Sequence, residues 1–272
     1  MSLSEVKPRV IVSGMLAGIT DGISRLEIVR EAIAFPWIDL TGDPLIAGIH
    51  TALHPDLKAA AAQLLYPNLP FINKLKRFGL TLFMRSLENT LDQAATLPQD
   101  VYLVLHPDNA AYLCLKLEGL KLQVPPNVII AVENDHGIHR GHYLPQLFPG
   151  ENPDPSHPAT VKSLTQKLAI LGVRTNLVLD IHHLHDSLPG MTIAEAMAHL
   201  GGRVDILHLS GDDHTGYSLP QIIDFTHQTN PRLVVLEGPV PPCFLLGLTH
   251  KELAALNHHI EKIKSHLNGH SE

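Results

Sequence analysis

Cysteine is scarce in this chain, with Cys114 and Cys243 the only two among 272 residues. Both are flanked by apolar residues or proline, and they do not form the closely spaced pair of a redox or zinc motif. Small secreted folds that depend on disulfides use far more cysteine than this. We therefore expect two reduced thiols in a cytoplasmic protein, and no disulfide.

The sequence also lacks a long apolar run. No stretch approaches the roughly 20 apolar residues that a membrane-spanning helix needs, and residues 1–9 have no apolar core of the kind found in signal peptides. The net charge of −7, with histidine neutral, gives no general support for binding nucleic acid or an anionic membrane. We expect a small-molecule substrate and no membrane partner. A local basic groove for nucleic acid and a homo-oligomer both stay compatible with these totals.

Histidine, in contrast, is abundant: there are 19, against 20 lysines and arginines together. Four of them lie in a polar C-terminal helix and tail, and we assign these to the solvent-exposed surface. They are His258, His259, His266 and His270. We expect residues 268–272 to be a disordered tail. The remaining histidines have to be judged by their place in the fold.

Eight short apolar segments alternate with helical patterns along the chain. The predicted strands are 10–15, 37–42, 80–84, 101–105, 128–132, 176–180, 204–207 and 233–236. The predicted helices are 21–35, 54–65, 72–78, 87–95, 113–122, 159–171, 193–200, 219–228 and 248–267. Strands that alternate with helices pair in parallel, and eight such units close into a (β/α)8 barrel of roughly 250 residues.

We therefore expect an α/β fold with one TIM-barrel domain over residues 1–272, in which 150–158 is a surface loop. An open, doubly wound sheet is the main alternative. It is disfavoured because residues 13–18, after the first strand, lack the glycine spacing of a dinucleotide-binding turn.

Metal-capable side chains stand directly after four successive predicted strands. In chain order these are Glu133, Asp180, His208 and Glu237. In a barrel the carboxyl ends of the strands converge on one mouth, so four such residues at equivalent positions predict a shared metal site. Oxygen and nitrogen donors without cysteine favour Mn²⁺, with Mg²⁺, Co²⁺ or Zn²⁺ as alternatives.

A second group of residues is predicted to add metal or substrate contacts. These additional candidates are His106, His183, Asp212 and His214. His183 follows Asp180 by three residues, so its side chain can face the same mouth. We expect His182 to point away or pack, and His185 to lie at the surface or behind the metal ligands. For the histidines and arginine of residues 136–142, a substrate-binding loop and a solvated loop are both open.

At these residues the chain resembles the xylose isomerase-like barrel superfamily, which includes ketose 3-epimerases, sugar isomerases, and apurinic-site and UV-damage endonucleases. In the epimerase branch, one divalent metal is held by Glu, Asp, His and Glu after strands five to eight. The matching residues here are Glu133, Asp180, His208 and Glu237. The second histidine of that branch matches His183, whereas His214 stands where the branch usually has arginine.

The nuclease branches resemble the chain in other details. UV-damage endonucleases share the motifs at 133–135, 180–183 and 208–210 and the turn at His106-Pro107, and 212–214 fits a motif of apurinic-site endonucleases. Two departures disfavour this branch. Residues 84–86 lack a metal-binding histidine of the apurinic-site enzymes, and the expected damage-probing glutamine is missing from 108–110.

The resemblance implies a metal-dependent isomerase or epimerase that acts on a small polyhydroxylated carbonyl compound. Glu133 and Glu237 would be the acid–base pair, because proton transfer next to a carbonyl needs a positioned base. The alternative is a metal-dependent phosphodiester hydrolase of the endonuclease type. A barrel that keeps the metal site for different biosynthetic chemistry is a further alternative. One bound metal favours the isomerase, and two or three favour the hydrolase.

Overall fold

Eight parallel strands close into a barrel in sequence order, and β8 pairs with β1 to complete the ring. The computed structural model describes residues 8–13, 29–33, 39–51, 87–119, 122–135, 143–209, 217–237 and 250–267. The strands are β1 (Arg9–Ser13), β2 (Arg30–Ile33), β3 (Ile46–His50), β4 (Val101–Leu105), β5 (Val128–Glu133), β6 (Thr175–Asp180), β7 (Ile206–Leu209) and β8 (Leu233–Leu236). The predicted α/β fold, a (β/α)8 barrel, is confirmed.

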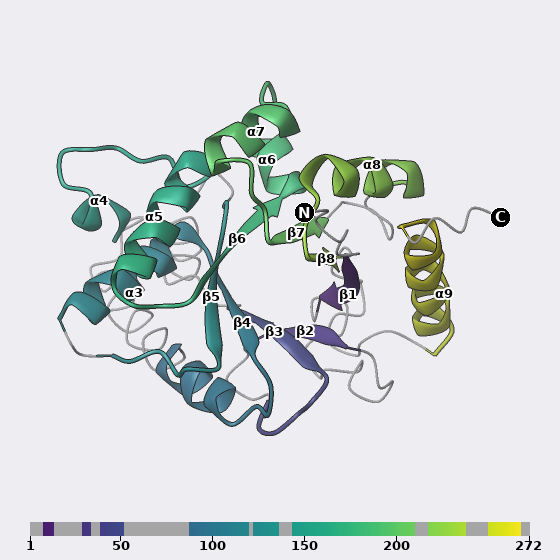
Figure 1. Cartoon of the computed structure of the whole chain (residues 1–272), viewed down its shortest axis with the longest axis horizontal. Coiled ribbons are helices and arrows are strands. Elements are labelled where there is room, and N and C mark those ends of the chain that lie inside the picture. Colours follow the sequence, from purple (N-terminus) through teal and green to yellow (C-terminus); the bar gives the residue numbers. More distant parts are fainter. Residues whose placement is uncertain are drawn as a thin grey trace, which may run out of the picture.

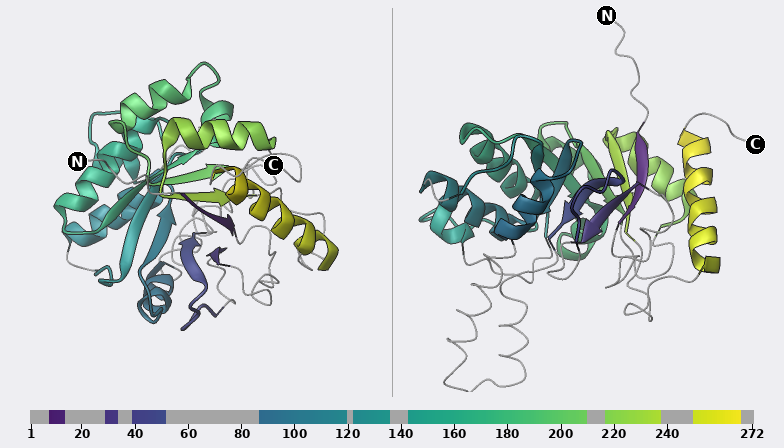
Figure 2. Two further views of the ribbon diagram at one scale, coloured as in Figure 1. Left: turned by 45° about the vertical axis from the view of Figure 1, so that its right-hand side comes forward. Right: turned by 90° about the horizontal axis from the view of Figure 1, so that it is seen from below.

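Helices surround this barrel on its outer side (Figure 1). They are α3 (Pro107–Glu118), α4 (Leu144–Leu147), α5 (Pro158–Ile170), α6 (Ile181–Ser187), α7 (Ile193–Leu200), α8 (Leu219–Thr229) and α9 (His250–Leu267). Residues 87–95 are helical as well. Neighbouring helices pack on one another around the ring, and α9 packs beside β1 (Figure 2). Among the helices that the structure describes, none has both the length and the apolar character that crossing a membrane requires.

Strand alternation divides the apolar residues into two cores. Side chains along a strand point alternately to its two faces, so one set faces the helices and the other faces the barrel interior. The interior set, which we call the inner core, consists of Ile11, Tyr102, Val104, Ala131, Val178, Ile206, Leu233 and Val235. Two residues further along β5, β6, β7 and β8, the inward position changes from apolar to metal-capable. The inner core therefore forms the floor of the predicted site.

The second predicted strand, 37–42, is wrong over its described residues, 39–42, which form no strand. Residues 41–42 form a turn in which the Thr41 amide donates to the Asp39 carboxylate at 3.0 Å and Gly42 has a φ of 71°. The strands that occupy this part of the barrel are β2 and β3. The first lies within the predicted helix 21–35, and the second was not predicted at all.

The misassignment of β2 has a physical cause, because its charged residues are buried. Arg30 and Glu31 look like the solvent face of an amphipathic helix, yet their exposed fractions are 1% and 0%. Arg30 pairs with Asp43 at 2.7 Å. The predicted strand 80–84 and helices 54–65 and 72–78 lie outside the described residues, and so does the tail 268–272.

Most of the remaining described elements agree with the prediction to within a few residues, whereas α4 and α6 were not predicted. β1, β4, β5, β6, β8 and α7 match closely. β7 lies two residues later than predicted, which places His208 inside the strand rather than after it. α3 begins at Pro107 instead of 113, since proline suits a first helical position. Residues 151–157 form no helix or strand, so the polar stretch here is a connection between α4 and α5.

Candidate metal centre

The four predicted metal ligands converge at the barrel mouth. Nδ1 of His208 lies 2.9 Å from Oε1 of Glu133 and 3.1 Å from Oε1 of Glu237. Asp180 is the register partner of His208 on the neighbouring strand. Glu133, Asp180 and His208 are fully buried, and Glu237 is nearly so. Buried carboxylates in such number require compensation by cations.

Two further histidines approach Glu133 from its other side. Nε2 of His50 lies 3.0 Å from Oε2 of Glu133, and Nε2 of His106 lies 3.5 Å from the same oxygen. The two oxygens of Glu133 thus face different imidazole groups, with His208 on one side and His50 with His106 on the other. His106 was predicted as an additional ligand. His50 was missed because its strand, β3, was not recognised.

Asn134, directly after β5, links the end of β5 to the end of β6. Its side chain accepts from the Asp180 amide at 2.8 Å and donates to the Asp180 carbonyl at 3.0 Å. Asp180 in turn is the N-cap of α6, where Oδ1 accepts the His183 amide at 2.8 Å. Nδ1 of His183 contacts the Asn134 carbonyl at 2.7 Å. These contacts explain how the end of β6 and the first turn of α6 present Asp180 and His183 to the mouth.

In each histidine of the mouth, one ring nitrogen is directed toward a protein acceptor. The other ring nitrogen is therefore the one available as a metal ligand. For His183 the engaged atom is Nδ1, as just described. Nδ1 of His50 lies 3.4 Å from the Thr51 carbonyl, and Nδ1 of His106 lies 4.0 Å from Oδ1 of Asp135. These three rings therefore offer Nε2 to the mouth. His208 is reversed, since Nδ1 faces the carboxylates of the mouth.

The imidazoles and carboxylates shift one another's pKa strongly. Burial opposes the charged form of His50, but Glu133, Glu31 and Glu237 outweigh it and raise the pKa to about 9. His183 is also buried, and Asp180 and Glu133 raise its pKa to about 9. Against its burial, the neighbouring histidines hold the pKa of Glu133 well below its ordinary range. Without a bound cation, protonated imidazoles supply the compensating positive charge.

The residues present fit a divalent cation. Several groups of these side chains have ligand atoms within 4.8 Å of one another, among them Glu133 with Asp180 and His183, and Glu133 with His50 and His106. Oε1 of Glu133, Oε1 of Glu237 and Nδ1 of His208 are buried and make no hydrogen bond within the described residues. Each such atom costs about 1–3 kcal/mol unless something engages it. An all-oxygen-and-nitrogen donor set is the one that Mn²⁺ and its relatives prefer.

The other predicted residues either lie apart from the metal-capable groups or fall outside the described residues. His182 contacts Asp186 at 3.4 Å along α6, and His185 packs edge-on against Tyr217 and Phe225, so neither belongs to the metal-capable groups of the described structure. Asp212, His214 and residues 136–142 lie outside the described residues. Asp135 was noted only as part of a motif, and it groups here with His106 and His183.

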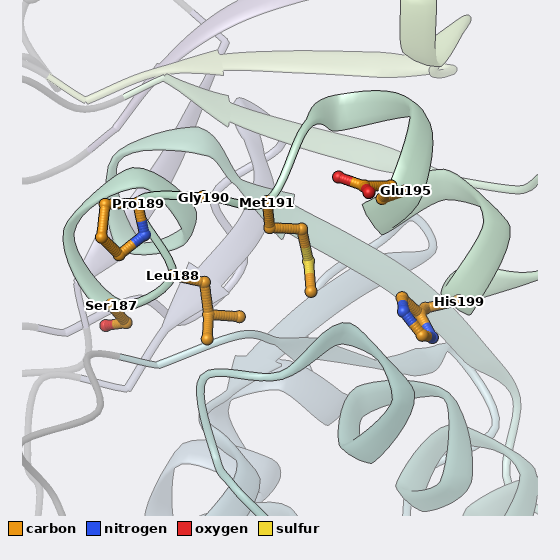
Figure 3. Close-up of a pocket in the computed structure, with 7 residues that line it drawn as sticks. All are labelled: Ser187, Leu188, Pro189, Gly190, Met191, Glu195 and His199. Atoms are coloured by element: carbon orange, nitrogen blue, oxygen red, sulfur yellow. The ribbon is translucent and has the colours of Figure 1, made fainter.

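A surface pocket between α6 and α7, drawn in Figure 3, shares no lining residue with this centre. It is lined by Ser187, Leu188, Pro189, Gly190, Met191, Glu195 and His199. Glu195 is engaged in the capping box at the start of α7, where its carboxylate accepts from Thr192 at 2.8 Å. His199 packs against His157 with ring centroids 4.6 Å apart. The polar groups of this pocket are thus committed to local structure.

Comparison with known proteins finds likeness in three dimensions only. No family model matches the chain, and no curated protein is similar to it in sequence. A 3-keto-D-glucoside 4-epimerase from E. coli has 11% sequence identity and a TM-score of 0.51, over 95% of this chain and all of its own. A sugar phosphate isomerase/epimerase from Parabacteroides distasonis has 12% identity and a TM-score of 0.45, over 97% and 98%. The likeness to the E. coli enzyme concerns the fold, and the chain is a (β/α)8 barrel.

Proposed function

We propose that this protein is a divalent-metal-dependent isomerase or epimerase that acts on a small polyhydroxylated carbonyl compound. The observation that carries the proposal is the convergence of Glu133 and Glu237 on one nitrogen of His208. Together with Asp180 they would hold the cation, for which Mn²⁺ is our first choice. When bound, the cation supplies Lewis-acid polarisation of a carbonyl and orients an adjacent hydroxyl.

The two glutamates are suited to an acid–base pair. They come from β5 and β8, which are separated in the barrel by β6 and β7. A substrate carbon placed between them would have one carboxylate on each side, so one removes a proton and the other returns it. General acid–base catalysis by a positioned carboxylate contributes about 10²–10⁴-fold to rate. His183 would donate a hydrogen bond to a substrate oxygen or act as an additional metal ligand.

The similar E. coli barrel is a 3-keto-D-glucoside 4-epimerase by name. At 11% identity this likeness concerns the fold, and it shows that a barrel of this shape can carry epimerase chemistry. It supports a keto sugar or a related polyol ketone as the first class of compound to examine. The buried carboxylates of the mouth also favour a small neutral substrate over a polyanion.

Solvent hydrogen exchange tests the proposal without a known product. The protein loaded with Mn²⁺ is incubated in D₂O with a panel of keto and aldo sugars, and deuterium next to the carbonyl is measured by NMR. We expect exchange with the natural protein and about 10²–10⁴-fold less with Glu237→Gln. Full exchange by Glu237→Gln, with unchanged metal content, contradicts the proposed roles.

A second candidate is a metal-dependent phosphodiester hydrolase, and one observation favours it. His50 and His106 face Oε2 of Glu133, so the glutamate could join two cation positions. Two-metal sites are typical of phosphoryl hydrolysis. Metal analysis of the purified protein separates the candidates. One equivalent per chain supports the isomerase, whereas two or three equivalents, with cleavage of a phosphodiester and no hydrogen exchange, support the hydrolase.

A further inference from the structure

Glu31 is a fully buried carboxylate that the proposed chemistry does not use. It lies on β2 with an exposed fraction of 0%. Leaving a carboxylate in the protein interior is costly unless charged or hydrogen-bonding groups surround it. Its position in the middle of a strand, facing inward, therefore calls for a partner inside the barrel.

The neighbouring strand β1 supplies a hydrogen bond to Glu31. The Ser13 hydroxyl of β1 donates to Oε1 at 3.5 Å. Tyr102 of β4 is the polar member of the inner core. Burial raises the pKa of Tyr102 well above its ordinary value, and the negative charge of Glu31 raises it further. The second oxygen of Glu31, Oε2, is left to face β7.

On β7 the group that meets this oxygen is His208. Its Nε2 lies 3.4 Å from Oε2 of Glu31, both side chains are fully buried, and neither of the two atoms makes a hydrogen bond within the described residues. The opposite nitrogen, Nδ1, faces Glu133 and Glu237. The ring therefore stands between two sets of carboxylates, with one nitrogen toward each.

A neutral imidazole carries one proton, and the nitrogen that binds a metal must be without it. Since Nδ1 of His208 faces the proposed metal ligands, the proton belongs on Nε2, where Glu31 can accept it. Histidines that bind metals usually donate their other ring N–H to a carboxylate or carbonyl, which fixes the ring and makes it a better ligand.

We propose that Glu31 is a positioning residue, which accepts the Nε2–H of His208 and so directs Nδ1 toward the metal. The inference rests on the proposed metal centre, but it holds for the isomerase and the hydrolase alike. Glu31 also lies within 4.8 Å of ligand atoms of His50, His208 and Glu237. Direct ligation by Glu31 is therefore the competing role that the experiment has to separate from positioning.

The test compares Glu31→Leu, Glu31→Gln and Glu31→Asp with the natural protein. Leucine removes the acceptor, glutamine keeps an uncharged one, and aspartate keeps the charge at a shorter reach. Co²⁺ content is measured by elemental analysis, and Co²⁺ affinity by competition with a chelator. Proton NMR of the Co²⁺ protein follows the shifted, exchangeable ring N–H of His208. Denaturant unfolding of the metal-free variants measures stability separately.

Asp205→Asn is the matched control. Asp205 is likewise a buried carboxylate next to β7, but it lies before the strand and accepts from the Leu177 amide at 3.0 Å and from Arg203 at 2.9 Å. We expect this variant to lower the free energy of unfolding and to leave Co²⁺ affinity unchanged. This variant shows the effect of losing a buried carboxylate that has only a structural role.

Positioning predicts an unchanged number of Co²⁺ ions and an affinity about 10–100-fold lower in Glu31→Leu. Glu31→Gln should be intermediate, Glu31→Asp should recover part of the loss, and the His208 N–H should exchange faster in Glu31→Leu. An affinity unchanged in both Glu31→Leu and Glu31→Gln overturns the inference, and so does the loss of one Co²⁺ per chain. A natural protein that binds no Co²⁺ overturns the proposed function and this inference together, whereas normal binding with unaffected variants overturns this inference alone.

Discussion

The barrel interior has two layers of opposite character, an apolar inner core and a mouth of charged side chains. The inner core consists almost entirely of aliphatic side chains, with Tyr102 as its polar exception. One inward position further along, the same strands present Glu133, Asp180 and His208, all fully buried. The lower layer stabilises the fold by burying apolar surface, whereas the upper layer places like charges together at a cost. The two layers therefore contribute to stability through different forces, apolar burial in the inner core and ion pairing at the mouth.

The largest expected effect comes from removing the carboxylate shared by both halves of the mouth. Glu133→Ala should lower hydrogen exchange or hydrolysis by at least about 10²–10⁴-fold, the range for losing a positioned acid–base group. Metal content should fall as well, since Glu133 contacts His208 on one side and His50 on the other. Elemental analysis and the rate of the reaction check this.

Val104→Ala is its counterpart in the inner core. It should cost about 1–3 kcal/mol of stability by creating a cavity, while metal content stays unchanged. Denaturant unfolding and elemental analysis measure the two effects. If Val104→Ala lost its metal as readily as Glu133→Ala, the two layers would not be independent.

A rise in pH should change the metal affinity and the stability of the metal-free protein in opposite directions. The pKa values of His50 and His183 are about 9 in the metal-free protein, and the pKa of His208, a proposed ligand, is also raised. A cation displaces one proton from each of these histidines that it binds, so metal affinity should rise by about tenfold per pH unit for each bound histidine through the neutral range. Chelator competition at several pH values measures the slope, and a flat profile would mean that none of the three histidines is a ligand.

The stability of the metal-free protein should change the other way. Both histidines have folded-state pKa values of about 9, raised above the unfolded value of about 6.5. Their contribution is fully present below about pH 6.5 and is lost as the pH rises through 9, by an amount on the order of a few kcal/mol. Denaturant unfolding at pH 6 and pH 9.5 tests the sign, with Val104→Ala as a variant that should keep the same slope.

Metal should stabilise the folded protein by a more modest amount. At a free metal concentration of 100 times Kd, linkage gives about 2.7 kcal/mol. Thermal unfolding with and without Mn²⁺ measures the gain, and Glu237→Gln should reduce it. An equal gain in both proteins would place the binding outside the mouth.

The smallest expected effect belongs to His182. It contacts Asp186 along α6 and is partly exposed, so His182→Ala should change stability by less than about 0.5 kcal/mol and leave metal content as it was. His183→Ala, one residue further on, should lower metal affinity because that ring faces the mouth. Metal affinity measured for both variants tests whether the boundary of the site lies between residues 182 and 183.

Much of the mouth could be predicted from the sequence, because in β5, β6 and β8 a buried apolar strand ends at a charged residue. That pattern is local and identified Glu133, Asp180 and Glu237 as neighbours. His50 and Glu31 could not be found this way. Glu31 follows Arg30 and resembles a solvent-exposed pair on a helix, although both are buried.

The strand that carries His50 contains a glycine, which argues against a strand in any local reading. The reason for Gly48 lies elsewhere in the chain. A side chain at this position would collide with the ring of Tyr102 on β4. Contacts of this kind connect residues far apart in sequence, so they become visible only once the barrel is closed.

The junction between β6 and α6 has a consequence for redesign. Strand and helix meet without any connecting residue, and Asp180 is at once the last residue of β6 and the N-cap of α6. Exchange of βα loops is the usual way to give a barrel new specificity, because loops tolerate insertion. Here an insertion between residues 180 and 181 would uncap the helix and displace His183 in one step. Laboratory evolution of this barrel should therefore leave the junction between β6 and α6 intact and diversify the other βα loops.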